Sequence, residues 1–177
     1  MIKSVRARRE SGMRFQITTS SGHSLAIDDA EGDSAPRPAE LLLAAQAGCA
    51  AFDVASILAK KRQSPSSYAV SVTGEQREDR HPHVYVRIDI VHEFEGADLD
   101  VAAVRRAIEL SATRYCTASA MFSAGPAEIH HRYVVSPGDG RPDETGEVVV
   151  TGPAEDPDAL GEHWLAAAAT VPAGAAR

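Results

Sequence analysis

One apolar segment, Pro38–Arg62 (PAELLLAAQAGCAAFDVASILAKKR), constrains the fold of this chain more than any other feature. Pro38 suits the first turn of a helix, and the cations of AKKR complement the negative end of a helix dipole. We therefore expect one long helix that stops before Pro65. Apolar residues lie on all its sides, which excludes a surface helix with one wet face, so other elements must enclose it. Cys49 lies at its centre.

The central part of this segment, Leu41 to Leu58, approaches the length of a membrane span. It contains Gln46, Asp53 and Ser56, and a charged group at bilayer depth costs about 3 kcal/mol. We interpret it as the buried helix of a soluble protein without a membrane partner. The N-terminal stretch MIKSVRARRESGMRFQ lacks the apolar run of a signal peptide, which favours a cytoplasmic location.

Composition and charge divide the chain into two parts. A hydrophobic share of 44% in 177 residues suffices for one domain with a core. Residues 1–135 carry a net charge of −1 and residues 136–177 carry −6. We predict a folded domain over 1–135 and an acidic, Gly/Pro-rich extension over 136–177 that is partly ordered at most, with GEVVVTG as a candidate edge strand and DPDALGEHWLAAAAT as a candidate helix. A nearly neutral domain without a basic patch argues against nucleic acid as partner.

The remaining pattern predicts an α+β fold. MRFQITTSSGHSLAIDD alternates around a Ser-Gly turn, which is typical of a hairpin, and YAVSVTGEQRE and HVYVRIDIVHEFEG alternate as a second, longer hairpin. DLDVAAVRRAIELSATR is an amphipathic helix with Asp98 or Asp100 as cap, YCTASAMFSAG is a short helix and PAEIHHRYVV is a last strand. The sequence has no glycine-rich phosphate loop and no C-x-x-C zinc spacing.

The two cysteines admit two interpretations each. Cys49 is either a small core residue or a nucleophile, and burial would raise its pKa unless a cation or donor lies nearby. Cys116, at the start of the short helix, is either a core residue or a thiol favoured by the helix dipole. If the sulfurs meet, they form an attacking and resolving pair, because a structural disulfide is disfavoured in a reducing compartment. His81, His83 and His92 lack a carboxylate partner at fixed spacing, so no metal site is predicted.

The motif Pro-x-Glu-Leu-Leu-Leu-Ala-Ala-x-x-Gly-Cys over Pro38–Cys49, followed by RYCTASAMFSAGPAEI, resembles the osmotically inducible and organic hydroperoxide resistance family, OsmC/Ohr. AFDVASILAKKR resembles the less characterised branch of that family. The resemblance covers about residues 14–135. It implies an intertwined homodimer whose antiparallel sheets wrap around two long central helices.

The resemblance also implies a reaction. The cysteine matching Cys49 attacks an organic hydroperoxide, and the cysteine matching Cys116 captures the resulting sulfenic acid as a disulfide. A dithiol such as a lipoyl group then reduces the disulfide, and neither a metal nor an organic cofactor is needed. The expected partners are therefore a second copy of the chain, an organic hydroperoxide and a dithiol reductant.

The family's activating groups match less well. Its hydroperoxidases place an acid ten positions before the first cysteine, where this chain has Ala39, and pair it with an arginine. Glu40 is the nearby substitute, although its alternative role is to complement the helix dipole. Arg14 is our first candidate for the arginine, ahead of Arg37 and Arg114. The alternative function is a dimeric binding module for a hydrophobic small molecule, with structural cysteines.

Overall fold

The computed structural model describes residues 1–154. The candidate helix over residues 156–170 lies outside this range. By its internal contacts the chain divides into two compact units, Met1–Ala45 and the part from Gln46 onward.

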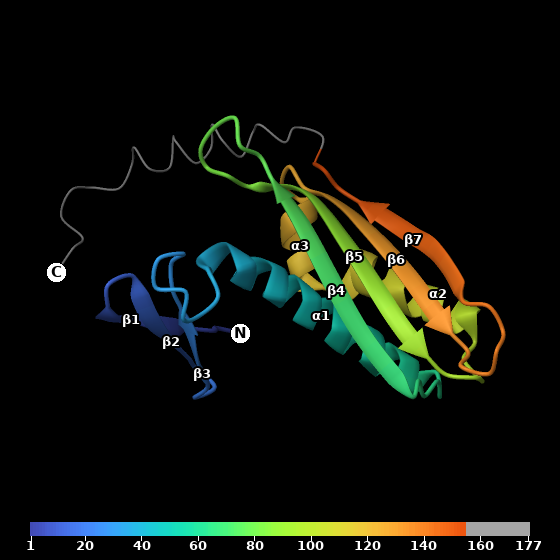
Figure 1. Cartoon of the computed structure of the whole chain (residues 1–177). Coiled ribbons are helices and arrows are strands. Elements are labelled where there is room, and N and C mark those ends of the chain that lie inside the picture. Colours follow the sequence, from blue (N-terminus) through green and yellow to red (C-terminus); the bar gives the residue numbers. More distant parts are fainter. Residues whose placement is uncertain (155–177) are drawn as a thin grey trace. The chain divides into compact units, whose positions relative to one another are not determined.

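The first unit contains a three-stranded antiparallel sheet in the order β1-β2-β3 (Figure 1). Its strands are β1 (Val5–Ser11), β2 (Arg14–Thr19) and β3 (Ser24–Ile27). The predicted β2–β3 hairpin is confirmed, and Gly22 in its turn has a φ of +87°, which favours glycine. Sequence analysis missed β1, because its residues VRARRES are mostly charged or polar and all are exposed.

The long helix α1 (Pro38–Lys60) is confirmed with the predicted start, and it ends within two residues of the predicted end. Its first two turns belong to the first unit and the rest to the second. Glu40 lies in its first turn and Lys60 in its last, as the helix dipole favours.

The second unit is a four-stranded sheet with helices (Figure 1). The predicted strands and helices are confirmed, and the edge strand considered at GEVVVTG is present. In chain order the elements after α1 are β4 (Ser67–Gln76), β5 (Tyr85–Glu95), α2 (Val101–Leu110), a π-helical turn η1 (Ser111–Tyr115), α3 (Thr117–Ser123), β6 (Glu128–Ser136) and β7 (Glu144–Thr151). The predicted boundary at residue 135 thus falls at the end of β6, and β7 continues the same sheet.

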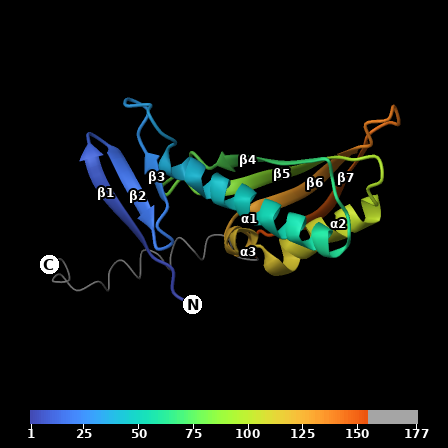
Figure 2. The same ribbon diagram turned by 90° about the horizontal axis from the view of Figure 1, so that it is seen from below.

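One strand pair departs from the predicted antiparallel arrangement. β5 and β6 are parallel, with Arg87 opposite Glu128 and Glu95 opposite Ser136, whereas β4–β5 and β6–β7 are antiparallel. A parallel pair needs a crossover connection, which α2, η1 and α3 provide. Figure 2 shows these helices on one face of the sheet, together with the part of α1 that belongs to this unit.

The core of the second unit lies between that sheet and the helices. Its buried residues come from α1, β5, α2 and β6: Val54, Leu58, Phe94, Val104, Ala107, Ile108, Tyr133 and Val135. Each large apolar side chain contributes about 1.5–3 kcal/mol by leaving water. Asp100 caps α2 as predicted, because its carboxylate accepts a hydrogen bond from the backbone N–H of Ala102 at 2.9 Å.

Within the part of the chain that the structure describes, α1 is only partly covered. Val54 and Leu58 are buried. Phe52, which lies between Cys49 and Val54 in the sequence, is 78% exposed. Among the described residues, α1 is the one helix that by length and composition is able to cross a membrane, a property shared by core helices of soluble proteins. The apolar surface that sequence analysis expected to be enclosed is therefore only partly enclosed by residues 1–154.

Two histidines are buried in the sheet. His92 on β5 and His131 on β6 are 0% and 1% exposed. The Nδ1 atom of His92 lies 2.8 Å from the Tyr68 hydroxyl, and Nε2 of His131 lies 3.4 Å from Oγ1 of Thr151. Burial and, second, the neighbouring His131 lower the pKa of His92 to about 3. Burial and then His130 lower the pKa of His131 to about 4.

These two histidines are expected to make the protein acid-sensitive. An unfolded histidine titrates near pH 6.5, so below that pH the unfolded chain takes up protons that the folded chain refuses. Each histidine should lower the free energy of unfolding by about 2 kcal/mol at about pH 5 relative to neutral pH. Urea unfolding at both pH values measures this, and His92→Gln and His131→Gln should each reduce the difference by about that amount. The exposed His23→Gln serves as control, and an equal pH dependence in all four proteins would contradict the assignment.

Candidate functional site

The second unit brings the two cysteines together. The sulfur atoms of Cys49 and Cys116 and a carboxylate oxygen of Asp53 all lie within 4.8 Å of one another. Both cysteines are reduced in the structure. Cys49 and Asp53 are half-buried and Cys116 is buried. Sequence analysis singled out both sulfurs of this cluster, and Asp53 follows Cys49 by one turn on the same face of α1.

The position of Cys116 follows from the local backbone. η1 ends at Cys116, whose backbone N–H donates to the Ser111 carbonyl oxygen at 2.8 Å. Cys116 then caps α3, because its sulfur accepts a hydrogen bond from the backbone N–H of Ser119 at 3.4 Å. A cap residue has extended backbone and points its side chain back at the helix start. The Cys116 sulfur thereby lies near Cys49 and Asp53 of α1.

Gln46 joins α1 to α3 beside the sulfurs. Its side-chain nitrogen Nε2 donates to the Ser119 hydroxyl at 2.8 Å and to the Cys116 sulfur at 3.8 Å. Gln46 and Ser119 are both 0% exposed, so this contact is shielded from water. The other end of the amide, Oε1 of Gln46, is buried without a hydrogen-bond partner among the described residues.

The surroundings shift the proton affinity of two groups in the cluster. Burial raises the pKa of the Cys116 thiol, and the hydrogen bonds from Ser119 oppose this in part. Burial also raises the pKa of the Asp53 carboxyl, and the Ser111 hydroxyl, which donates to Oδ2 of Asp53 at 3.4 Å, acts in the opposite direction. Both shifts favour the neutral, protonated forms of these groups.

The same three side chains are the group of described residues best placed to share a metal ion. Two thiolates and a carboxylate suit a thiophilic ion such as zinc, with a fourth position left open. Sequence analysis predicted no metal. The donor set is compatible with one.

The other two predicted site residues belong to the first unit. Arg14 on β2 donates from Nε to Glu10 at 3.1 Å and from a terminal nitrogen to the Ser34 side chain. Glu40 accepts a hydrogen bond from the backbone N–H of Arg37 at 2.8 Å. Each of these polar groups has a partner inside its own unit.

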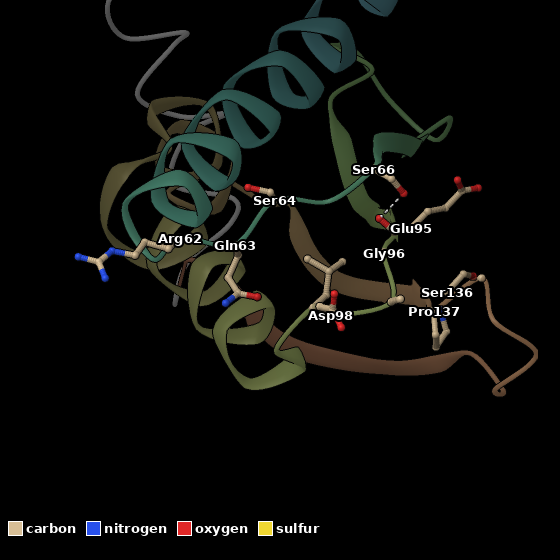
Figure 3. Close-up of a pocket in the computed structure, with 12 residues that line it drawn as sticks. Arg62, Gln63, Ser64, Ser66, Glu95, Gly96, Asp98, Ser136 and Pro137 are labelled. Carbon is tan, nitrogen blue, oxygen red and sulfur yellow. Dashed lines mark hydrogen bonds between the residues drawn. The ribbon is translucent and has the colours of Figure 1, made fainter.

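Two surface hollows of the second unit have different relations to the cluster. Cys116 and Arg114 both line a hollow of about 450 Å³ that also reaches Thr151 on β7. A larger hollow of about 670 Å³ lies where β5 and β6 end, beside Gln63 and Asp98 (Figure 3). Its walls are tied by a hydrogen bond from Ser66 to the Glu95 carbonyl oxygen, and none of the predicted site residues lines it.

Sequence analysis assigned no part in the chemistry to Asp53 of the cluster or to its neighbours Gln46, Ser111 and Ser119. Gln46 and Asp53 carried a signal, because they are polar residues in an otherwise apolar helix at positions i−3 and i+4 from Cys49. Ser111 and Ser119 carried none, since serine is common in helix ends and turns.

Comparison with known proteins identifies relatives of this chain. The OsmC-like protein family matches residues 31–143. The protein YhfA of Escherichia coli K12 is 40% identical over 124 residues, which is 70% of this chain and 91% of YhfA. A hypothetical protein from Aquifex aeolicus has a solved structure with 28% identity and a TM-score of 0.67, covering 77% of this chain and 97% of its own. An organic hydroperoxide resistance protein from Elizabethkingia anophelis shares the fold at 13% identity and a TM-score of 0.58, covering 77% and 96%.

The proximity of the sulfurs predicts that mild oxidation links them. A disulfide has an S–S length of about 2.05 Å, which a small approach of α3 and α1 would reach from the observed separation. Treatment with diamide should remove both free thiols and give a monomeric-mass chain with one internal disulfide, seen by thiol titration and non-reducing mass spectrometry. Cys49→Ser and Cys116→Ser should each retain one thiol or cross-link between chains. Two titratable thiols in the treated native chain would contradict the geometry.

Proposed function

This chain belongs to the OsmC-like family, and we propose that it reduces organic hydroperoxides with the thiols of Cys49 and Cys116. The observation that carries the proposal is the pair of reduced sulfurs within 4.8 Å of each other. A structural role for two cysteines in one core does not require them to meet, whereas capture of a sulfenic acid does. The name organic hydroperoxide resistance, borne by a protein of the same fold, agrees with this chemistry.

The burial of the two sulfurs supports the order of events. Cys49 is half-buried and so is within reach of a substrate, while Cys116 is buried and burial raises its pKa. Cys49 as thiolate attacks the terminal oxygen of the hydroperoxide, which gives a sulfenic acid and an alcohol. Cys116 then attacks the Cys49 sulfur, which gives a disulfide and water. A dithiol of the lipoyl class returns the pair to its reduced state.

Gln46 supports a ligand site at the sulfurs. A buried carbonyl oxygen without a partner costs about 1–3 kcal/mol, and such groups in folded proteins call for a functional explanation. Oε1 of Gln46 is an acceptor for the O–H of a bound hydroperoxide or of a water molecule. Its Nε2 end meanwhile keeps Cys116 in place.

Activation of Cys49 by Arg14 and Glu40 is a second, separable part of the proposal and rests on the family resemblance. In the structure Arg14 binds Glu10 and Ser34, and Glu40 binds the Arg37 backbone. Activation would require Arg14 to face the thiolate as well. Arg114 shares a hollow with Cys116 and is the alternative cation within the second unit.

We further propose that the protein is a homodimer in the cytoplasm, whose two α1 helices form its centre. The exposed apolar side chains of the second unit support this: Phe52 on α1 is 78% exposed, Met121 on α3 is 74% exposed and Tyr115 is 52% exposed. Large exposed apolar groups are a feature of interaction surfaces when they form one patch, and the proposed dimer would bring them together. A cytoplasmic location suits two free thiols, because that compartment keeps cysteines reduced.

Turnover of an organic hydroperoxide tests the catalytic proposal. With cumene hydroperoxide and dihydrolipoamide, the native chain should consume peroxide, while Cys49→Ser should lose activity to the uncatalysed rate. Cys116→Ser should react once and then stall as a sulfenic acid that dimedone traps. The assay is run with and without EDTA, and no dependence on metal is expected. Equal rates in all three chains would instead favour the binding module with structural cysteines.

The dimer is tested by light scattering. Phe52→Asp places a charge in the proposed interface, and burial of an unpaired charge is strongly unfavourable, so the variant should shift to a monomer. Val150 lies on β7 opposite His130 and is 40% exposed, so Val150→Asp is the matched control and should remain dimeric. A native chain that is monomeric at micromolar concentration would contradict the dimer and leave the sulfur geometry unchanged.

A further inference from the structure

We propose that Asp53 is the proton-transfer residue of this site, and that its carboxyl receives the proton of each thiol in turn and delivers it to the departing oxygen. The inference rests on the proposed peroxide reduction and adds a residue to it. In this proposal the acid of the site is Asp53, which lies at the sulfurs, and not Glu40 in the first turn of α1.

The geometry places one carboxyl beside both sulfurs. Asp53 follows Cys49 by one helical turn on the same face of α1, and its oxygen lies within 4.8 Å of the sulfurs of both Cys49 and Cys116. A proton crosses such a gap directly after a small approach or through one water molecule. A single group therefore serves both half-reactions.

Ser111 fixes the carboxyl relative to Cys116. The Ser111 hydroxyl donates to Oδ2 of Asp53 at 3.4 Å, and the Ser111 carbonyl oxygen accepts from the backbone N–H of Cys116 at 2.8 Å. Ser111 is 2% exposed, so both contacts are protected from water. The π-helical turn η1, a feature found often at functional sites, begins at this residue.

The first half-reaction balances with this group alone. Asp53 carboxylate takes the proton of the Cys49 thiol, and the thiolate attacks the terminal oxygen of ROOH. The O–O bond breaks while the S–O bond forms, so sulfur is oxidised and the peroxide is reduced. The leaving alkoxide takes the proton from Asp53, which yields ROH, a sulfenic acid on Cys49 and Asp53 carboxylate.

The second half-reaction repeats the cycle. Asp53 carboxylate takes the proton of the Cys116 thiol, and the Cys116 thiolate attacks the Cys49 sulfur. The S–S bond forms while the S–O bond breaks, and the leaving hydroxide takes the proton from Asp53 as water. The products are a disulfide and Asp53 carboxylate, so the carboxyl ends in the state in which it began.

The test compares Asp53→Asn with Asp98→Asn in single-turnover stopped flow with cumene hydroperoxide, in EDTA. Asp98 is an exposed carboxylate that lines the distant hollow and is a matched control. General acid–base catalysis contributes about 100-fold or more, so Asp53→Asn should slow peroxide consumption and disulfide formation by about that factor, and Asp98→Asn should match the native chain.

Chemical rescue separates proton transfer from a structural effect. Asp53→Ala leaves space for a small acid, so added formate should restore part of its rate in proportion to concentration, with no effect on the native chain. Circular dichroism and thermal unfolding confirm that the variants are folded. If both Asp53 variants react as fast as the native chain, or are slow without rescue by formate, the proposal is wrong while the peroxidase function stands. A native chain that consumes no peroxide removes both.

Discussion

The hydrogen bond between Gln46 and Ser119 is the contact on which the site depends. It joins α1 to α3 across 73 residues of sequence, is shielded from water, and lies next to the Cys116 sulfur. A buried amide in an apolar helix is costly unless it is paired, so the two helices are stable in the register that satisfies it. That register sets the separation of Cys49 and Cys116. The apolar core of Val54, Leu58 and the sheet adds packing energy but has no comparable directional preference.

The same register gives the two thiols unequal surroundings. Cys49 lies on a helix whose next turn exposes Phe52, whereas Cys116 is enclosed by the cap of α3 and accepts hydrogen bonds from Ser119 and Gln46. A half-buried thiol and a buried thiol suit the proposed two-step oxidation, in which the second sulfur should not react with peroxide first. The asymmetry follows from fold position, since the two residues are chemically identical.

Local signals in the sequence were sufficient to predict most helices and strands. They were insufficient to predict how the strands pair. Pro38 and the terminal cations bounded α1, alternation defined β4 and β5, and Asp100 capped α2. The β1 strand lacked an apolar face, so alternation gave no sign of it, and the parallel β5–β6 pair depends on a crossover that no local pattern reports. In the site, the meeting of the sulfurs was implied by family resemblance. The contacts of Gln46, Ser111 and Ser119 depend on how η1 and α3 pack, which periodicity does not encode.

The site gathers two thiols and a carboxyl, and three acids within 4.8 Å repel one another if all are ionised. Two arrangements relieve this repulsion: a cation beside the cluster, or a proton retained on one member. The raised pKa values of Asp53 and Cys116 correspond to the second arrangement. A protonated Asp53 is a neutral neighbour for the two sulfurs, whereas an ionised Asp53 would add a like charge beside them. The family resemblance implies the first arrangement, an acid paired with an arginine, and this chain has Ala39 where that acid is expected.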